Sequence, residues 1–183
     1  MKNLGDFIRV YDNALSSDAC EIILTRFRGS SQWNLAGQGS NSTDPNLRNC
    51  DTIDISDHKA TGGAHLDLDE MLFRGVGRTI QRYIKEHPHV MIRHDTGYEI
   101  LRYSTGTECR EHVDSYPDRP RTLSCSIALN DDYEGGEFTF FGGELSYRVP
   151  AGSAIVFPSN FQYPHAVTPV VRGTRYSVIT WLA

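Results

Sequence analysis

The chain has 183 residues, a length that fits a single domain with a core large enough to fold without disulfides. Its 18 basic and 23 acidic residues give a net charge of −5 without any basic run, so we expect neither nucleic acid nor a membrane surface as a partner. No apolar stretch reaches membrane-spanning length, and the N-terminal residues lack the apolar core of a signal peptide, which predicts a cytoplasmic protein.

The four cysteines are widely separated and show no Cys-x-x-Cys spacing; they are Cys20, Cys50, Cys109 and Cys125. This pattern favours free thiols in a reducing compartment. We therefore expect neither a zinc site nor a disulfide framework.

The N-terminal half predicts helices and a long loop. Residues 7–11 alternate as a short strand, and Ser residues before Asp18 cap a helix that runs to about Arg28. Residues 48–55 can form another strand. Residues 66–86 carry apolar side chains at helical spacing with acids in the first turn, which predicts a second, amphipathic helix.

Residues 29–47 form a polar stretch rich in Gly, Ser and Asn, and a loop of this length in a compact domain is usually functional or disordered. Trp33 is its one large aromatic residue. It could anchor the loop as a lid in the substrate pocket, or it could pack at the edge of the first helix. A second loop, residues 115–120, is the other candidate for covering a substrate.

From residue 98 onward the chain predicts short strands bounded by Gly, Pro, Asp or Asn. They span residues 98–104, 108–114, 121–129, 136–141, 145–149, 153–157, 164–170 and 174–182. Eight such strands predict a mainly β, α+β fold: a double-stranded β-helix, or jelly roll, with the N-terminal helices packed outside. We expect one domain over residues 1–183, with helical support and the lid loop in 1–96 and the metal-binding core in 97–183.

Two histidines and one aspartate in this core predict a metal site. If His112 and Asp114 lie at the end of a strand, the period of two places both side chains on one face. His165 would come from another strand and complete a set of three. Two imidazoles and one carboxylate are the ligands of non-haem Fe(II) sites that keep coordination positions free.

Arg175 follows His165 by ten residues and offers a planar guanidinium for a carboxylate. The strand period places Ser177, Ile179 and Trp181 on the same face. A cation, a hydroxyl and an apolar wall in line form a suitable pocket for a small dicarboxylate.

The remaining histidines are assigned structural or solvated positions. His65 and Asp67 form a second His-x-Asp, but they directly precede the helix at 66–86, so we interpret them as its N-terminus. We expect solvated loop positions for His58, His87, His89 and His94. We also interpret Gly135 and Gly136 as a hairpin turn without a catalytic role.

From about residue 100 to the end, the chain resembles the Fe(II)/2-oxoglutarate-dependent oxygenases, and within them the prolyl 4-hydroxylase-like group. The matching strings are residues 101–106 (LRYSTG), 112–114 (HVD), 129–130 (LN), 134–137 (EGGE), 157–158 (FP), 165–170 (HAVTPV), 173–177 (GTRYS) and Trp181.

The resemblance implies a role for each matching residue. His112, Asp114 and His165 would hold Fe(II), and Arg175 would bind the distal carboxylate of 2-oxoglutarate. The same resemblance assigns Tyr103 and Ser177 to the cosubstrate and Trp181 to the pocket wall, and it adds O2 as a cosubstrate and ascorbate as an accessory cofactor. One departure is Ala128, where some protein-prolyl hydroxylases carry a tyrosine.

The implied activity is hydroxylation of an unactivated C–H bond with conversion of 2-oxoglutarate to succinate and CO2. Our first hypothesis for the substrate is a prolyl residue in a peptide or protein, and the alternative is a free amino acid or other small molecule. A non-catalytic, cupin-like metal-binding module is a further alternative, but it has no use for the guanidinium of Arg175.

Overall fold

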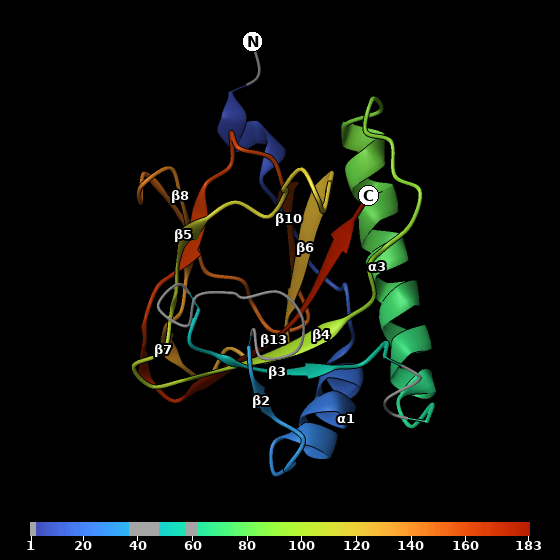
Figure 1. The fold of residues 1–183 in the computed structure, drawn as a ribbon, viewed down its shortest axis with the longest axis vertical. Helices are drawn as coiled ribbons and strands as arrows, with labels where there is room; N and C mark the ends of the chain where they lie inside the picture. The colour runs from blue at the N-terminus through green and yellow to red at the C-terminus, as the bar shows by residue number, and fades with distance from the viewer. Residues whose placement is uncertain (1–2, 37–47, 58–61) are drawn as a thin grey trace.

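A computed structural model describes residues 3–36, 48–57 and 62–183, so His58 and residues 37–47 of the proposed lid lie outside the described residues. The chain forms two β-sheets that lie opposite each other, and the helices lie beside the larger one (Figure 1). The fold is therefore mainly β with two long helices, in agreement with the prediction.

The larger sheet is antiparallel and has seven strands. In spatial order they are β1 (Arg9–Tyr11), β10 (Ala154–Pro158), β6 (Leu123–Ala128), β13 (Thr174–Leu182), β4 (Glu99–Ser104), β3 (Asp51–Asp54) and β2 (Asn34–Leu35). The longest strand, β13, lies at the centre, where it pairs with both β6 and β4. The C-terminal strand thus joins the two halves of the larger sheet.

The opposite sheet has four antiparallel strands, and a short two-stranded ribbon accompanies it. Its order is β5 (Cys109–His112), β11 (His165–Val167), β8 (Phe138–Phe140) and β9 (Leu145–Tyr147), and the ribbon pairs β12 (Val170–Arg172) with β7 (Glu134–Gly135). Because β5 and β11 are neighbours, residues more than fifty positions apart in sequence meet in register, with His112 opposite His165.

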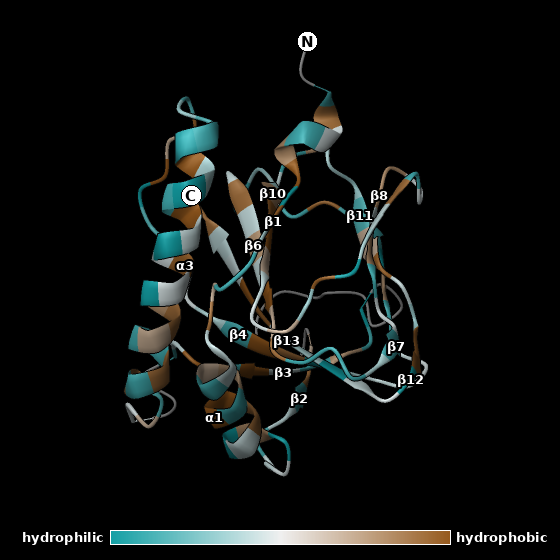
Figure 2. Ribbon diagram, turned by 180° about the vertical axis from the view of Figure 1, so that it is seen from behind, coloured by the Kyte–Doolittle hydropathy of each residue, from teal (hydrophilic) through white to brown (hydrophobic). Residues whose placement is uncertain are grey.

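Two helices cover the larger sheet through their apolar faces. A 3-10 turn, η1 (Leu4–Phe7), precedes them; α1 (Ser17–Phe27) begins at Ser16, whose Oγ accepts from the Ala19 amide at 3.2 Å, and α3 spans Leu66–Glu86. Hydrophobic and hydrophilic residues alternate along both helices, whereas the strand β10 is mostly hydrophobic (Figure 2). The buried helix residues share one cluster with alternate residues of β6 and β13, so the other face of the sheet is left for a cavity.

Three predicted boundaries differ from the structure. β5 ends at His112, so Asp114 lies beyond the strand. The strand predicted over residues 164–170 is divided into β11 and β12 by Thr168 and Pro169, and proline lacks the amide that a continuous strand would need. The short strand β2 lies inside the segment that we predicted to be a loop.

The solvated position predicted for His87 is wrong. Its ring is buried and packs against the rings of Phe7 and Tyr83 at centroid distances of 5.0 and 4.5 Å. The reason is helical spacing, because His87 follows Tyr83 by four residues and so lies on the same buried face of α3. His89 and His94 are exposed, as predicted.

All four cysteines are buried free thiols. Among the described residues, neither of the two long helices is apolar enough to cross a membrane.

Candidate metal centre and cosubstrate pocket

A cavity of about 940 Å³ lies against the inner face of the larger sheet. Its wall includes all four residues of β13 that we placed on one face: Arg175, Ser177, Ile179 and Trp181. β4 contributes Tyr103, and the opposite sheet contributes the two histidines of the predicted metal site. The cavity is therefore lined by cationic, hydroxyl, imidazole and aromatic groups together.

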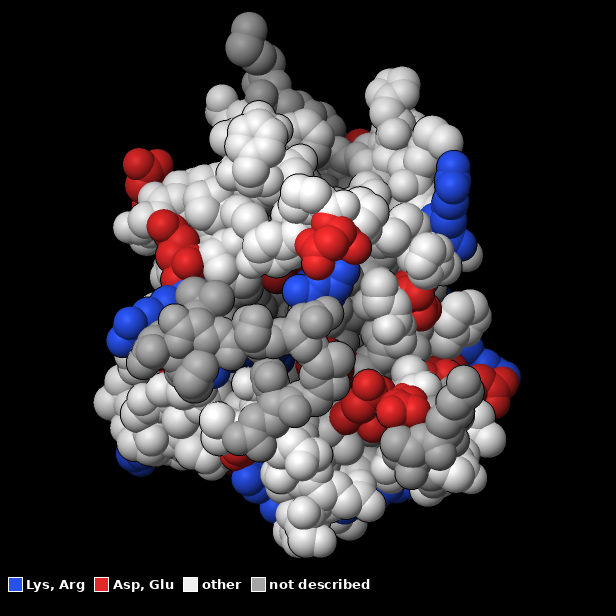
Figure 3. All heavy atoms as spheres, viewed as in Figure 1, with Lys and Arg blue, Asp and Glu red and all other residues white. Residues whose placement is uncertain are grey.

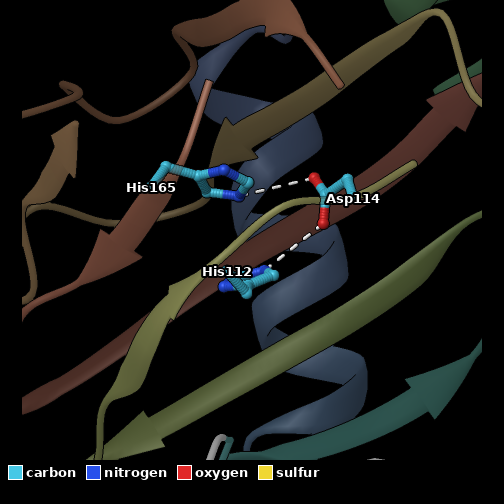
Figure 4. Close-up of side chains that lie close together, drawn as sticks. All are labelled: His112, Asp114 and His165. Atoms are coloured by element: carbon cyan, nitrogen blue, oxygen red, sulfur yellow. Dashed lines mark ion pairs between the residues drawn. The ribbon is translucent and has the colours of Figure 1, made fainter. Parts of the chain in front are cut away.

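His112, Asp114 and His165 converge in this cavity (Figure 4). Their candidate ligand atoms all lie within 4.8 Å of one another. The Nε2 atom of His112 is 3.3 Å from Asp114 Oδ1, and the Nε2 atom of His165 is 3.4 Å from Asp114 Oδ2. Two imidazoles and a carboxylate at this separation suit one divalent cation that retains open coordination positions.

Backbone carbonyls orient both imidazoles. The Nδ1 atom of His112 is 2.8 Å from the Arg110 carbonyl oxygen, and that of His165 is 3.1 Å from the Tyr163 carbonyl oxygen. A carbonyl oxygen can only accept a hydrogen bond, so Nδ1 carries a proton in each ring. The Nε2 atoms are then the ones presented to a metal, as is usual for histidine ligands.

Asp114 reaches the centre through a tight connection to the end of β10, and the strand periodicity that we assumed does not apply to it. The amide nitrogens of Asp114 and Ser115 donate to the Ser159 carbonyl oxygen at 3.1 and 2.9 Å. Ser124 Oγ on β6 donates to Asp114 Oδ2 at 2.6 Å and lies 2.8 Å from Ser159 Oγ. These contacts hold the carboxylate between the two imidazoles.

The charge of the centre follows from these contacts. Burial raises the pKa of Asp114, but the hydrogen bonds from His112 and His165 outweigh it and hold the pKa well below its ordinary value. Burial also lowers the pKa of His112, but hydrogen bonds to Asp114 and Cys109 outweigh it and raise that pKa to about 11. Asp114 is therefore an anion, and a bound cation would replace the proton of His112.

Ser124→Ala is expected to lower metal affinity about 10- to 100-fold, as loss of a hydrogen bond to a ligand generally does. The variant keeps all three ligands but frees Asp114 to rotate. Titration of the apoprotein with Mn(II) would measure the effect, with Ser104→Ala, an exposed serine on β4, as the matched control. Equal affinities for Ser124→Ala and Ser104→Ala would contradict a positioning role for Ser124.

Arg175 is 2 % exposed and lies in the same cavity, without a carboxylate partner among the described residues. One of its terminal nitrogens donates to Ser177 Oγ at 2.9 Å, and its Nε has no hydrogen-bond partner. The guanidinium lies 5.1 Å from the ring centre of Tyr103 and 5.2 Å from that of Phe138. A buried cation is costly unless an anion accompanies it, so this residue fits a ligand that carries a carboxylate.

The hairpin turn predicted at Gly135 and Gly136 is wrong. Gly135 belongs to β7, which pairs with the distant strand β12. At Gly136, where φ is +69°, an added Cβ would lie 2.9 Å from Cδ of Arg175 and 3.1 Å from the Tyr133 ring. The missing side chain thus makes room for the arginine, a role that the turn interpretation did not include.

Gly136→Ala is expected to raise the 2-oxoglutarate concentration needed for half-maximal binding by about tenfold or more, because it displaces the guanidinium. Gly142→Ala is a matched control: Gly142 has φ of +67° and nothing within 4 Å of an added Cβ. Both variants impose the same backbone strain, but Gly136→Ala alone crowds Arg175. Isothermal titration of the metal-loaded protein would measure both, and equal losses would show that strain is the cause.

The two tryptophans lie in different environments. Trp181 lines the cavity, and the Arg121 guanidinium lies 3.6 Å from its ring centre. Trp33 does not line the cavity: its indole N–H donates to the Phe27 carbonyl oxygen at 2.9 Å, and its ring lies 6.0 Å from that of Tyr176. Of the two positions that we considered for Trp33, the described residues show the packing at the end of the first helix, and a lid role for the loop stays a prediction.

The second His-x-Asp motif is the start of a helix, as interpreted. His65 precedes α3 and packs edge-on against Phe27 at 5.2 Å. Asp67 forms two hydrogen bonds with Arg26, at 2.8 and 2.6 Å. The two side chains therefore serve packing and helix pairing.

Several cavity residues were not among the predicted ones. Arg48, Arg121 and Ser126 line the cavity, and Ser124 contacts Asp114 without lining it. The serines alternate with Cys125 in a fully buried strand, and this alternation of polar and apolar residues in β6 was the available signal. Arg48 and Arg121 precede or follow loops, where the sequence has no periodicity to place them.

Comparison with known proteins identifies the family to which the chain belongs. The model of the 2OG-Fe(II) oxygenase superfamily matches residues 98–183. A PKHD-type hydroxylase of Synechococcus elongatus is 30% identical over 156 residues, covering 72% of this chain and 68% of the relative. The chain belongs to the 2OG-Fe(II) oxygenase superfamily. This agrees with the resemblance found in the sequence and with the three converging side chains.

Other oxygenase relatives show how far the similarity extends. A PKHD-type hydroxylase of Synechococcus sp. strain CC9902 is 31% identical over 145 residues, covering 69% of this chain and 64% of the relative. One of Alteromonas mediterranea is 38% identical over 94 residues, or 40% of its length. The chain thus spans less than two thirds of these relatives.

Solved structures show the same fold at low identity. A prolyl hydroxylase from Trichoplax adhaerens, in complex with a hypoxia inducible factor peptide, superposes with a TM-score of 0.79 at 18% identity and covers 96% of this chain and 83% of that one. A Pseudomonas putida prolyl-4-hydroxylase gives a TM-score of 0.68 at 20% identity, with coverage of 96% and 91%. The chain therefore has the same fold as these prolyl hydroxylases.

Proposed function

We propose that the chain is an Fe(II)- and 2-oxoglutarate-dependent dioxygenase that hydroxylates an unactivated C–H bond and releases succinate and CO2. The observation that carries the proposal is that three ligand side chains and the unpaired cation of Arg175 lie in one cavity. We interpret the two opposed sheets as a double-stranded β-helix that holds these groups on its inner surfaces.

The residues present fit both groups that the proposal requires. His112, Asp114 and His165 would hold Fe(II) through two Nε2 atoms and a carboxylate, and Arg175 would bind the distal carboxylate of 2-oxoglutarate. When bound, iron, 2-oxoglutarate and O2 supply the oxidising chemistry, and the chain orients them and excludes water. Ascorbate belongs to the same proposal as an accessory component, which is tested by omitting it from the assay.

For the substrate, we propose a prolyl residue in a peptide or protein. The cavity of about 940 Å³ is far larger than a five-carbon diacid needs, so it leaves room for a substrate. Loop 115–120 forms part of its wall, and backbone hydrogen bonds in both directions between Tyr116 and Arg119, at 3.2 and 3.0 Å, keep the loop folded beside the opening. The Trichoplax adhaerens prolyl hydroxylase, whose structure contains a hypoxia inducible factor peptide, supports this choice by analogy.

A free amino acid or other small molecule is the second candidate. It is favoured by the charges of the cavity wall, where Glu99 and Asp54 lie in the same lining as Arg119 and Arg121. Acidic and basic side chains also stand side by side on the face of the molecule shown in Figure 3. A zwitterion could use both signs of charge.

The deciding experiment measures succinate formation by the Fe(II)-loaded protein with three sets of substrates: proline-containing peptides, free amino acids, and no added substrate. The peptide proposal predicts stimulation by peptides, with a mass increase of one oxygen on a prolyl residue. Stimulation by free amino acids alone would establish the second candidate. A complete lack of succinate, with and without ascorbate, would reject the oxygenase proposal.

A further inference from the structure

We propose that Ser126 binds the cosubstrate, by donating a hydrogen bond from its hydroxyl to the distal carboxylate that Arg175 is proposed to hold. This inference rests on the proposed function, since it assumes that 2-oxoglutarate occupies the cavity. It adds a residue that neither the sequence motifs nor the contacts of Arg175 identified.

Ser126 lies in the part of the cavity wall that β6 forms. It belongs to β6, where it shares the inner face with Ser124 and Ala128, and it lines the cavity. Ser126 pairs with Ile179 of β13, whereas Ala128 pairs with Ser177. Along β6, Ser126 is therefore two residues, about 7 Å, from Ser124, which contacts Asp114. In the other direction it is equally far from Ala128, whose partner Ser177 contacts the Arg175 guanidinium.

The Ser126 hydroxyl is available to a ligand. The residue is 2 % exposed, and within the described part of the chain its side chain makes no hydrogen bond, whereas Ser124 has two hydrogen-bond partners and Ser177 has one. A hydroxyl that lines a cavity and has no protein partner is free to donate a hydrogen bond to whatever occupies that cavity. Its position in the cavity wall allows a bound ligand to supply the missing partner.

The distal carboxylate is the acceptor that suits this hydroxyl best. Arg175 directs one terminal nitrogen to Ser177, so the guanidinium lies over the pair adjacent to Ser126. A carboxylate has about four lone-pair positions, and a guanidinium alone satisfies two of them in the bidentate arrangement. Ala128, the β6 member of this pair, offers no side-chain donor, which leaves Ser126 as the nearest hydroxyl on that strand.

The test compares affinity for 2-oxoglutarate in Ser126→Ala, Ser126→Thr and the unchanged protein. Isothermal titration of the Mn(II)-loaded protein under nitrogen measures binding without turnover. Ser126→Ala is expected to bind 2-oxoglutarate about tenfold more weakly, the usual effect of losing a hydrogen bond to a charged group. Ser126→Thr, which keeps the hydroxyl, should bind within about threefold of the unchanged protein.

Two further titrations make the assignment specific. Affinity for Mn(II) alone should be the same in Ser126→Ala and the unchanged protein, which shows that the metal centre and the fold are intact. Affinity for 2-oxobutanoate, an α-keto acid without a distal carboxylate, should also be unaltered by Ser126→Ala. A parallel loss for both keto acids would place the hydroxyl elsewhere and overturn the inference.

Failure of the inference is distinguishable from failure of the proposed function. If the unchanged protein binds Mn(II) but not 2-oxoglutarate, the proposed function is rejected together with this inference. If it binds both, and Ser126→Ala binds 2-oxoglutarate equally well, the inference alone is rejected.

Discussion

His165→Ala is expected to abolish metal binding and, with it, all Fe(II)-dependent turnover of 2-oxoglutarate. His165 is one of the three proposed ligands, and no other described residue belongs to the group that could hold the metal, so no described side chain can replace its Nε2 atom. The readout besides activity is thermal unfolding. A metal that binds the folded state stabilises it by about 2.7 kcal/mol at a free concentration 100 times its dissociation constant. The unchanged protein should show this shift with Mn(II), and His165→Ala should show none.

The His165 ring also packs on Phe157 at 4.6 Å and Phe140 at 5.7 Å, so its loss costs some stability without metal. The comparison is therefore made within each protein, between metal-free and metal-loaded samples. His94→Ala, which changes an exposed histidine, is the matched control and should behave like the unchanged protein. Retention of 2-oxoglutarate turnover near the original level in His165→Ala would show that the metal lies elsewhere.

The fold was largely predictable where hydrophobic periodicity is strong. The helix predicted at residues 66–86 coincides with α3, because its apolar positions recur at helical spacing and face the larger sheet. The central strand β13 was also predicted, since residues 174–182 directly follow the turn residue Gly173 and are rich in β-branched and aromatic side chains. What could not be predicted was how strands pair across long distances, such as β12 with β7, because the sequence pattern carries no information on partner strands.

In the site, too, local periodicity was predictable and contacts between distant segments were not. The alternation that placed Arg175 and Ser177 on one face also places them in the cavity, since both lie within a continuous strand. Asp114 was correctly grouped with the two histidines, but the strand argument for it was incomplete. Its orientation depends on Ser124, on β6, and on Ser159, just beyond β10. Likewise, the space that Gly136 leaves for Arg175 is a tertiary contact between distant segments. No local pattern reveals such contacts.

Arg175→Ala is expected to weaken 2-oxoglutarate binding by about 2 to 5 kcal/mol, on the order of a hundredfold or more, because a buried carboxylate would lose its charged partner. Arg175→Lys should restore the affinity in part, since an ammonium group supplies the charge but not the planar pair of donors. Titration of the Mn(II)-loaded proteins with 2-oxoglutarate measures both effects. Arg172→Ala, a change at an exposed arginine on the neighbouring β12, is the matched control and should have no effect.

The cause of that loss can be separated from general damage to the cavity by comparing two ligands. If Arg175 recognises the distal carboxylate, the unchanged protein should prefer 2-oxoglutarate strongly over 2-oxobutanoate, and Arg175→Ala should lose most of this preference while binding 2-oxobutanoate as before. Collapse of the cavity would instead weaken both ligands, because Arg175 also packs between Tyr103 and Phe138. Full preference for 2-oxoglutarate in Arg175→Ala would place the carboxylate at another cation of the cavity wall. Arg48 would then be the residue to change next, since it lines the same cavity and its only carboxylate contact among the described residues is with Glu99 at 3.8 Å.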